Sequence, residues 1–172
     1  MEKWDILSPQ GKVTGRTVVR GNAFLKPGEY HLVVHIWIVS PSGKFLTQQR
    51  SPIKKLMPGE WAATGGAAIA GEDSFTAASR ELYEELGIKS DETTLLFKKR
   101  IKRRNSLLDV WVITADIAEN ELVLQKSEVA DAKWVSRDTL EEMIKNGQYH
   151  NYGKEYFSAV FSKIEDYLGV VV

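Results

Sequence analysis

An α/β fold with a mixed sheet between helices is predicted by the order of elements along the chain. Segments with the composition or period of strands come first, followed by a helix, further strands and two final helices. The chain has 172 residues, 43% of them hydrophobic, which suits one domain with a sizeable core. No repeat, low-complexity tract or linker divides the sequence, so we expect a single domain over residues 1–172.

The N-terminal half is predicted to consist of strands and turns. Residues 4–20 alternate apolar and polar side chains around a turn signal at 8–11, which indicates a hairpin, and we regard residues 1–30 as an N-terminal hairpin extension. Residues 32–39 are rich in β-branched and aromatic side chains and are expected to form a buried strand. The remaining segments are a strand over 44–50 after a turn at 40–43, a basic loop with prolines over 51–60, and a short strand entering a loop over 61–71.

The clearest helix covers residues 74–86. Phe75, Leu82 and Leu86 repeat with the period of an α-helix, which predicts an apolar stripe that holds the helix on the sheet. The segment is also bounded by capping residues, with aspartate or serine at its start and glycine directly after it. The elements expected after it are strands over 95–102 and 107–115 joined by a basic turn, a short strand over 133–135, and helices over 138–145 and 156–168.

Charge and composition exclude several classes of protein. Lys plus Arg and Asp plus Glu number 23 each, so a net charge of zero gives no general attraction to nucleic acid or to an acidic membrane. The basic hairpin at 98–104 is therefore expected to be solvated surface. There is no cysteine, which excludes disulfides, thiolate zinc sites and cysteine nucleophiles and fits a cytoplasmic protein. We see no signal peptide, and the longest apolar stretch, 32–39, is too short to span a bilayer.

Three glutamates of the helix are predicted to share one face. At about 100° per residue, Glu81 and Glu85 lie about 40° apart around the helix axis, and Glu84 lies about 60° to the other side of Glu81. Like charges at this spacing repel one another. Taken alone, such a run of charge favours a solvated acidic surface. A bound Mg²⁺ or Mn²⁺, which prefers oxygen ligands, would instead offset the repulsion, and the longer pattern around the glutamates favours this second interpretation.

That longer pattern consists of two glycines, four glutamates, an arginine and two aliphatic residues in 23 residues. Its nine positions are Gly66, Glu72, Arg80, Glu81, Leu82, Glu84, Glu85, Gly87 and Ile88. The segment 66–88 resembles the Nudix box, a loop–helix–loop catalytic motif, at every fixed position. The resemblance implies a Nudix-type α/β/α sandwich with a mixed β-sheet, and a Mg²⁺-dependent pyrophosphohydrolase that cleaves a phosphoanhydride bond.

The same resemblance implies roles for individual residues. In the family, box glutamates and the backbone carbonyl of the first glycine bind the metal. Carried over to this chain, the implied ligands are Glu81, Glu84, Glu85 and Gly66. Arg80 is expected to orient a glutamate, and Glu72 is expected to brace the preceding loop against Arg80. The glutamate that acts as general base varies within the family and is left unassigned.

The flanks of the box resemble isopentenyl diphosphate isomerase, a relative built on the same scaffold. The similar segments are 31–35, 49–51, 54–55 and 58–61. That enzyme needs a cysteine near 61–66 for proton transfer and a metal-binding histidine just after it. This chain has no cysteine, and Ala67 stands near the place of the histidine. Isomerase activity is therefore disfavoured.

Four residues outside the box are further candidates for the site. Arg50 and Lys55 precede the box and are expected, from the isomerase resemblance, to contact the diphosphate, with solvated loop charge as the alternative. Nudix enzymes often recruit one further acid from another strand or loop. Asp109 and Glu128 are both candidates for that role, and the sequence does not decide between them.

The combined expectation is a cytoplasmic hydrolase that acts on a small-molecule diphosphate, such as a nucleoside diphosphate linked to another group. A catalytically silent nucleotide-sensing domain is the alternative from a different class. Neither nucleic acid nor a membrane is expected as a partner, and the oligomeric state is open, a homodimer included. For His31 and His35, which face the same side of a predicted strand, a buried hydrogen-bonded role and a substrate role remain equally open.

Overall fold

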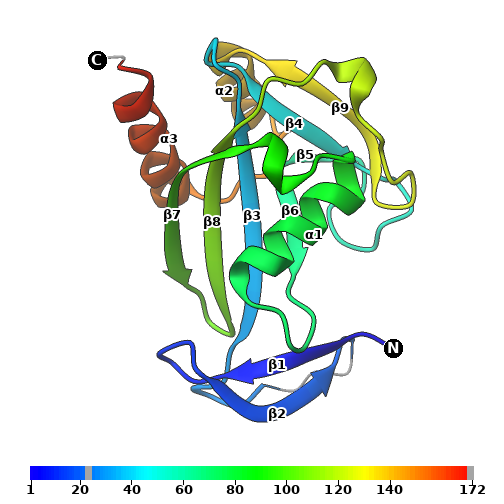
Figure 1. Cartoon of the computed structure of the whole chain (residues 1–172), viewed down its shortest axis with the longest axis vertical. Coiled ribbons are helices and arrows are strands. Elements are labelled where there is room, and N and C mark those ends of the chain that lie inside the picture. The colour runs from blue at the N-terminus through cyan, green and yellow to red at the C-terminus, as the bar shows by residue number, and fades with distance from the viewer. Residues whose placement is uncertain (22–24, 170–172) are drawn as a thin grey trace.

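A β-sheet with helices on both faces forms the body of the structure, a computed structural model that describes residues 1–21 and 25–169 (Figure 1). Five strands lie in the order β5-β4-β3-β8-β7, while β6 pairs with β3 and β9 pairs with β4. A separate two-stranded sheet contains β1 and β2. The strands are β1 Lys3–Leu7, β2 Val13–Val19, β3 His31–Val39, β4 Phe45–Arg50, β5 Trp61–Ala62, β6 Thr64–Ala67, β7 Thr94–Lys102, β8 Ser106–Thr114 and β9 Val129–Val135.

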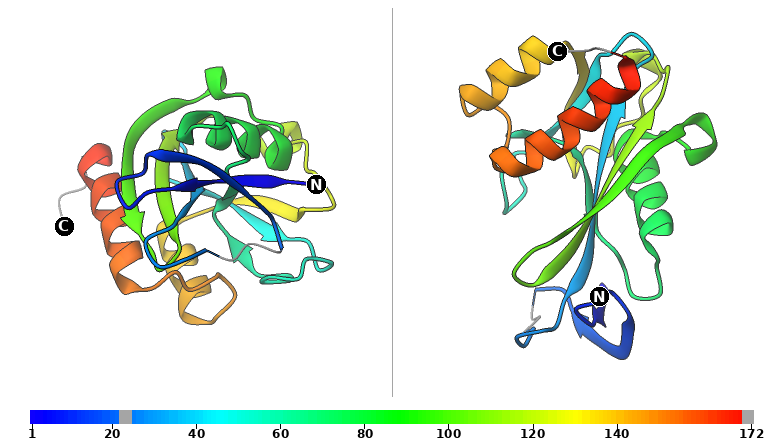
Figure 2. Two further views of the ribbon diagram at one scale, coloured as in Figure 1. Left: turned by 90° about the horizontal axis from the view of Figure 1, so that it is seen from below. Right: turned by 90° about the vertical axis from the view of Figure 1, so that its left-hand side faces the viewer.

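The helices form layers on opposite faces of this sheet, as Figure 2 shows edge-on. They are α1 Ser74–Leu86, α2 Arg137–Lys145 and α3 Lys154–Leu168, with short 3-10 turns at Ser90–Glu92 and Glu119–Glu121. Side chains alternate along β3, so Val34 and Ile36 join the core beneath α1, whereas Trp37 and Val39 join the core beneath α2 and α3. Because β3 and β8 run parallel and the other pairs antiparallel, the predicted α/β/α sandwich with a mixed sheet is confirmed.

Strand β3 has different pairing partners along its two edges. One edge of β3 pairs with β8 along its whole length, from His31 to Val39. The other edge changes partner, because Val33–Ile36 pairs with β6 and Ile38–Val39 pairs with β4. Since β6 leads directly into the loop before α1, this arrangement holds the glycines of β6 beside the first half of β3.

The N-terminal hairpin lies at one end of the sheet and is attached to the loop before α1 (Figure 1). Ala70 N–H donates to the Lys3 carbonyl at 2.8 Å, and Gly71 N–H donates to Asp5 Oδ2 at 2.7 Å. The Trp4 ring stacks on His31, with ring centroids 4.2 Å apart. The hairpin expected over residues 4–20 is therefore present, and its contacts tie it to the chain segment that leads into the box helix.

Helix α1 has the predicted boundaries, and its caps explain them. The Asp73 carboxylate accepts the Thr76 N–H at 2.8 Å, and Gly87 has a left-handed φ of 75° while its N–H donates to the Tyr83 carbonyl. Leu82 and Leu86 are buried as the stripe predicts, but Phe75 is 57% exposed. The prediction for Phe75 was wrong: the first-turn residues that are buried are the small Ser74 and Ala77, while the Phe75 ring lies beside Trp111 and stays exposed.

Strand β9 begins at Val129, four residues before the predicted start. Gln49 pairs with Asp131 while Arg50 pairs with Val129, so Ala130 is an extra residue in the ladder. A bulge of this kind interrupts the alternation of side chains that identifies a strand in a sequence. The expected strand over 61–71 is likewise two short strands, β5 and β6, and α3 begins two residues earlier than predicted.

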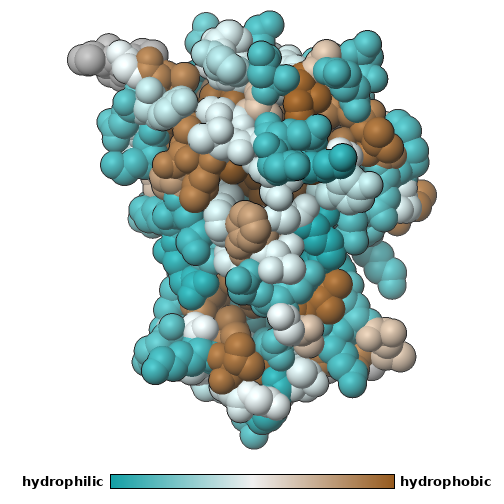
Figure 3. Space-filling view, in the orientation of Figure 1, coloured by the Kyte–Doolittle hydropathy of each residue, from teal (hydrophilic) through white to brown (hydrophobic). Residues whose placement is uncertain are grey.

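The molecular surface is mainly polar on the side where α1 lies. Figure 3 shows separate hydrophobic patches there among hydrophilic side chains. In residues 1–21 and 25–169, no helix is both long enough and apolar enough to cross a membrane.

We expect Leu82→Ala to lower the free energy of unfolding by about 2–5 kcal/mol, because the leucine is 3% exposed in the core beneath α1. Tyr83→Ala, one position along the same helix but 57% exposed, is the matched control and should change stability by about 1 kcal/mol or less. Urea unfolding of both variants measures the difference. Equal losses in the two variants would contradict the packing described for α1.

Candidate active site

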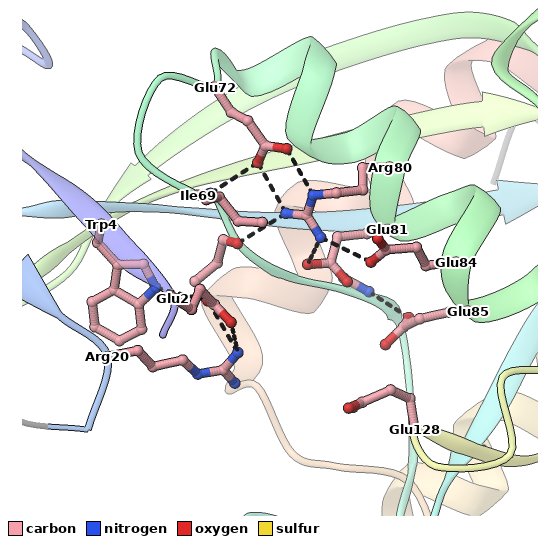
Figure 4. A network of polar contacts seen from close by, with 12 residues as sticks. Glu2, Trp4, Arg20, Ile69, Glu72, Arg80, Glu81, Glu84, Glu85 and Glu128 are labelled. Carbon is pink, nitrogen blue, oxygen red and sulfur yellow. Dashed lines mark hydrogen bonds and ion pairs between the residues drawn. The ribbon is translucent and has the colours of Figure 1, made fainter.

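A cleft of about 520 Å³ lies between α1, β6, the loop after β4 and the N-terminal hairpin. The residues that line it come from segments far apart in the chain. The charged ones are Glu2, Arg20, Arg50, Lys54, Arg80, Glu81, Glu84, Glu85, Arg103 and Glu128. Figure 4 shows the acidic side chains of α1 grouped around Arg80, with Glu2 and Arg20 of the hairpin nearby.

Glu85 is the most deeply buried carboxylate of the cleft, with 3% of the residue exposed. Its Oε2 accepts hydrogen bonds from Gln48 Nε2 at 2.8 Å and from the Gly65 N–H at 3.1 Å. Burial, followed by the negative charge of Glu81, raises the pKa of Glu85 to about 8. The side chain is thus held in one orientation, with a proton affinity suited to exchange near neutral pH.

Glu81 lies against the backbone of β6. A Cβ atom placed on Gly66 would come within 2.3 Å of Glu81 Oε1 and 2.7 Å of its Cδ. A side chain at this position would therefore displace the Glu81 carboxylate from the backbone of β6. Burial also raises the pKa of Glu81, although the charge of Arg80 opposes the shift.

Arg80 connects the loop before α1 with the carboxylates of the helix (Figure 4). Its Nε and Nη2 donate to the two Glu72 oxygens at 2.7 and 2.9 Å, and Nη2 also donates to the Ala67 carbonyl. Its Nη1 donates to Glu81 at 2.9 Å and to Glu84 at 3.1 Å. The guanidinium is committed to these protein partners, an arrangement that suits an orienting residue better than a phosphate contact.

The expected metal ligands are close together but are not arranged around one point. Within the described ranges, no three Asp, Glu or His side chains converge closely enough to hold an ion. The reason is that Glu81 and Glu84 turn toward Arg80 while Glu85 turns toward β4 and β6. The donor set nevertheless suits a divalent cation, because such ions prefer oxygen ligands and the two neighbouring carboxylates supply them. Burial raises the pKa of both groups, and the hydrogen-bond donors on Glu85 are uncharged.

Basic side chains line the same cleft as these carboxylates, and Arg50, Lys54 and Arg103 are called the basic wall. Arg50 and Lys54 come from the end of β4 and the loop after it, and Arg103 comes from the turn after β7. Lys54 Nζ donates to Glu128 Oε1 at 2.6 Å, so Glu128 also belongs to this wall. The negative charge of Glu128 is felt at Glu81, where it contributes to the raised pKa.

The four candidates from outside the box divide into two pairs. Arg50 and Glu128 line the cleft. Lys55 is exposed and absent from the lining, and the neighbouring Lys54 takes that place. Asp109 is completely buried in β8, where both oxygens accept from Arg100 at 2.6 and 2.7 Å, so the structure brings Glu128 and not Asp109 to the carboxylates of α1.

Several cleft residues were not identified from the sequence. Glu2 and Arg20, which form an ion pair at 2.8 Å, reach the cleft only because the hairpin folds against the loop before α1. Gln48 had no signal beyond its place in a strand, although it is 1% exposed and holds Glu85. Of the two histidines, His35 lines the cleft, whereas His31 stacks beneath Trp4 and is absent from the lining.

Fold and cleft together define the class as an α/β/α protein in which an acidic helix and a basic wall line one cleft. The profile of the NUDIX domain matches residues 29–155, and the chain belongs to the Nudix family. The resemblance carried by the segment 66–88 is thereby confirmed.

Individual relatives agree with this assignment. The uncharacterised Nudix hydrolase lmo0368 of Listeria monocytogenes is 40% identical over 153 residues, covering 88% of this chain and 90% of its own. An isopentenyl-diphosphate delta-isomerase of Rhodobacter capsulatus is 34% identical over 126 residues, covering 69% and 71%. The crystal structure of DR0079 from Deinococcus radiodurans superposes with a TM-score of 0.72 at 22% identity, covering 87% of this chain and 93% of that one. This chain is thus a Nudix hydrolase homologue whose flanks also resemble the isomerases.

In chelator, the free energy of unfolding should fall as pH rises from about 4.5 to about 8. Unfolded Glu85 loses its proton near the usual pKa of 4.5, whereas folded Glu85 keeps it until about 8, so the folded state binds more protons in this window. The loss is about 1.4 kcal/mol per unit of the pKa difference. Urea titrations at pH 5, 6.5 and 8 should show this decline, and Glu85→Gln should flatten it. Parallel declines in the two proteins would show that Glu85 is not the responsible group.

Proposed function

We propose that this chain is a metal-dependent hydrolase that cleaves a diphosphate linkage in a small molecule, such as a nucleoside diphosphate linked to another group. The observation that supports this most directly is the pair Glu81 and Glu85. Both are carboxylates with raised pKa values, and both lie in a cleft that Arg50, Lys54 and Arg103 also line. Acidic groups for a metal and basic groups for phosphate thus face the same space.

Glu81, Glu84, Glu85 and the Gly66 carbonyl are the residues that would hold Mg²⁺ or Mn²⁺. A bound divalent ion supplies charge neutralisation of the diphosphate and lowers the pKa of water. To hold the cation, Glu81 and Glu84 would have to release the guanidinium of Arg80. Arg80 keeps its two bonds to Glu72 and so continues to hold the loop before α1.

The protein side chains then divide the work of hydrolysis. Arg50 and Lys54 bind the phosphates from the basic wall and stabilise the charge on the leaving phosphate. A carboxylate of the acidic cluster accepts the proton of the attacking water. The raised pKa of Glu85 belongs to the metal-free protein, and a cation held by this carboxylate would lower it, so the pKa does not single out Glu85 for this step. Glu128 lies across the cleft as a further acid, held by Lys54.

Two alternatives make different predictions in a single substrate panel. A nucleotide-sensing domain would bind nucleotides without releasing phosphate, and a cleft that retains three box glutamates argues against it. An isomerase would interconvert isopentenyl and dimethylallyl diphosphate, which the absence of cysteine disfavours. The panel therefore contains nucleoside triphosphates, dinucleoside polyphosphates, nucleotide sugars, coenzymes and prenyl diphosphates.

The same absence of cysteine is compatible with the cytoplasmic location we infer.

Phosphate release should require Mg²⁺ or Mn²⁺ and should stop in excess chelator, because the acidic cluster of α1 offers oxygen ligands only. Restoring the cation in excess over the chelator should restore the rate. Turnover that persists after dialysis against chelator would contradict the metal-dependent mechanism and leave the family assignment intact.

Glu85→Gln should reduce turnover by orders of magnitude without lowering the melting temperature. The amide oxygen can accept the bonds from Gln48 and Gly65, so the fold is kept, but one ligand charge is lost. Glu142→Gln on α2, an exposed glutamate far from the cleft lining, is the matched control and should leave turnover unchanged. Near-normal turnover of Glu85→Gln would indicate that these carboxylates form an acidic surface and not a catalytic site.

A further inference from the structure

His35 lies at the cleft end of a chain of hydrogen bonds that begins in the core. Trp37 Nε1–H, an indole group that can only donate, lies 2.8 Å from the Tyr156 hydroxyl oxygen. The same hydroxyl lies 3.0 Å from Nδ1 of His35. Trp37 and Tyr156 are 3% and 5% exposed, so water does not compete for these bonds. The chain joins α3 to β3 directly beside the cleft.

These two contacts determine which nitrogen of His35 carries the proton. The Tyr156 oxygen accepts from Trp37, and its single hydrogen then has His35 Nδ1 as its acceptor within the described part of the chain. If Nδ1 donated instead, the phenol hydrogen would be buried without a partner, which folded proteins avoid. Nδ1 is therefore the acceptor, and the hydrogen of the neutral ring is on Nε2.

The Nε2–H group opens into the cleft. In residues 1–21 and 25–169, Nε2 makes no hydrogen bond, yet the buried side-chain atoms without a partner are His31 Nδ1 and Gln48 Oε1 only. His35 itself lines the cleft. Its neighbour across the β3–β6 pair is Gly65, which has no side chain to fill the space beside the imidazole. The structure thus directs this N–H donor toward the cleft.

The surroundings of His35 favour a phosphate as that acceptor. Gly65, directly across the strand pair, donates its N–H to Glu85, so the imidazole is one residue pair away from the acidic cluster. Arg103 is close enough for its charge to act on His35, and Arg50 lines the same cleft. Burial, together with that charge, lowers the pKa of His35 to about 3, so the ring stays neutral at physiological pH.

We propose that His35 binds a phosphoryl oxygen of the substrate through Nε2–H, and that Tyr156 is a positioning residue that enforces this tautomer. The inference rests on the proposed diphosphate substrate and adds to the basic wall a donor that carries no charge. An uncharged donor can hold a phosphate without competing with the cation for the box glutamates.

Nitrogen NMR of the uniformly labelled protein tests the tautomer directly, without any turnover. His35 should show a protonated Nε2 and an unprotonated Nδ1 throughout the range from pH 6 to pH 8. Tyr156→Phe should produce a mixture of tautomers, because the Nδ1 acceptor loses its donor. A hydrogen on Nδ1 in the unmodified protein would overturn the proposal.

Calorimetry with Mg²⁺ and methylenediphosphonate, a diphosphate that is not hydrolysed at its bridge, tests the contact itself. His35→Leu should raise the dissociation constant about tenfold or more, because a hydrogen bond to a charged group is lost. His35→Gln, which keeps a neutral N–H donor, should stay within about threefold of the original value. His150→Gln, outside the cleft lining, is the matched control. Melting temperatures show whether each variant is folded. If His35→Leu does not fold, the NMR measurement on the unmodified protein still tests the proposal.

The outcomes separate this inference from the proposed function. Unchanged affinity in His35→Leu alongside metal-dependent hydrolysis would overturn the inference alone. Weakened binding in His35→Leu, in a protein that hydrolyses nothing in the substrate panel, would support the inference and contradict the proposed hydrolase. A His35 Nε2 resonance that responds to a nucleoside and not to methylenediphosphonate would assign the donor to another part of the ligand and overturn the phosphate contact. Failure of the unmodified protein to bind the probe would overturn the phosphate contact, whereas the proposed function is decided by the substrate panel.

Discussion

The contact between Arg80 and Glu72 is the interaction on which the site depends. It joins Glu72, at the end of the loop before α1, to Arg80 in the middle of that helix through two charge-assisted hydrogen bonds. The same guanidinium offsets the charges of Glu81 and Glu84, and Glu72 in turn accepts the N–H of Ile69. Without this single cation, the loop would lose its attachment and the acidic residues of the helix would repel one another. The hairpin is built onto the same loop, through the backbone of Ala70 and Gly71.

Burial and like charge act together on the remaining carboxylate. Glu85 lies beyond the reach of Arg80, and its bonds to Gln48 and Gly65 do not offset the loss of water, so its pKa rises to about 8. In the metal-free protein, ionisation of Glu85 is therefore unfavourable. A bound cation would stabilise the charged form of this carboxylate. His35 lines the same cleft, but its ring stays neutral, and its N–H donor is directed by hydrogen bonds alone.

Elements with strong local signals could be predicted from the sequence. Helix α1 was predicted with its observed limits, because a helical period and two caps coincide there. Local signals failed where the reason for a conformation lies elsewhere in the fold. The bulge at Ala130 interrupts the side-chain alternation of β9, and the first turn of α1 buries Ser74 and Ala77 instead of Phe75. Charge identity was also insufficient: Lys54 and Lys55 are adjacent, and only the path of the loop decides which of them turns into the cleft.

By itself, the sequence determined the order of the elements, the family and the spacing that places three glutamates on one helix face, because all of these depend on residues close together in the chain. Tertiary structure decided the cleft. It placed Glu128 in the cleft and buried Asp109 inside the sheet against Arg100, and it brought Arg20 and Arg103 to the cleft and Tyr156 to His35. Contacts across up to 121 positions have no period or spacing to reveal them. They exist only after β3 has paired with β6 and β8 and the helices have covered both faces of the sheet.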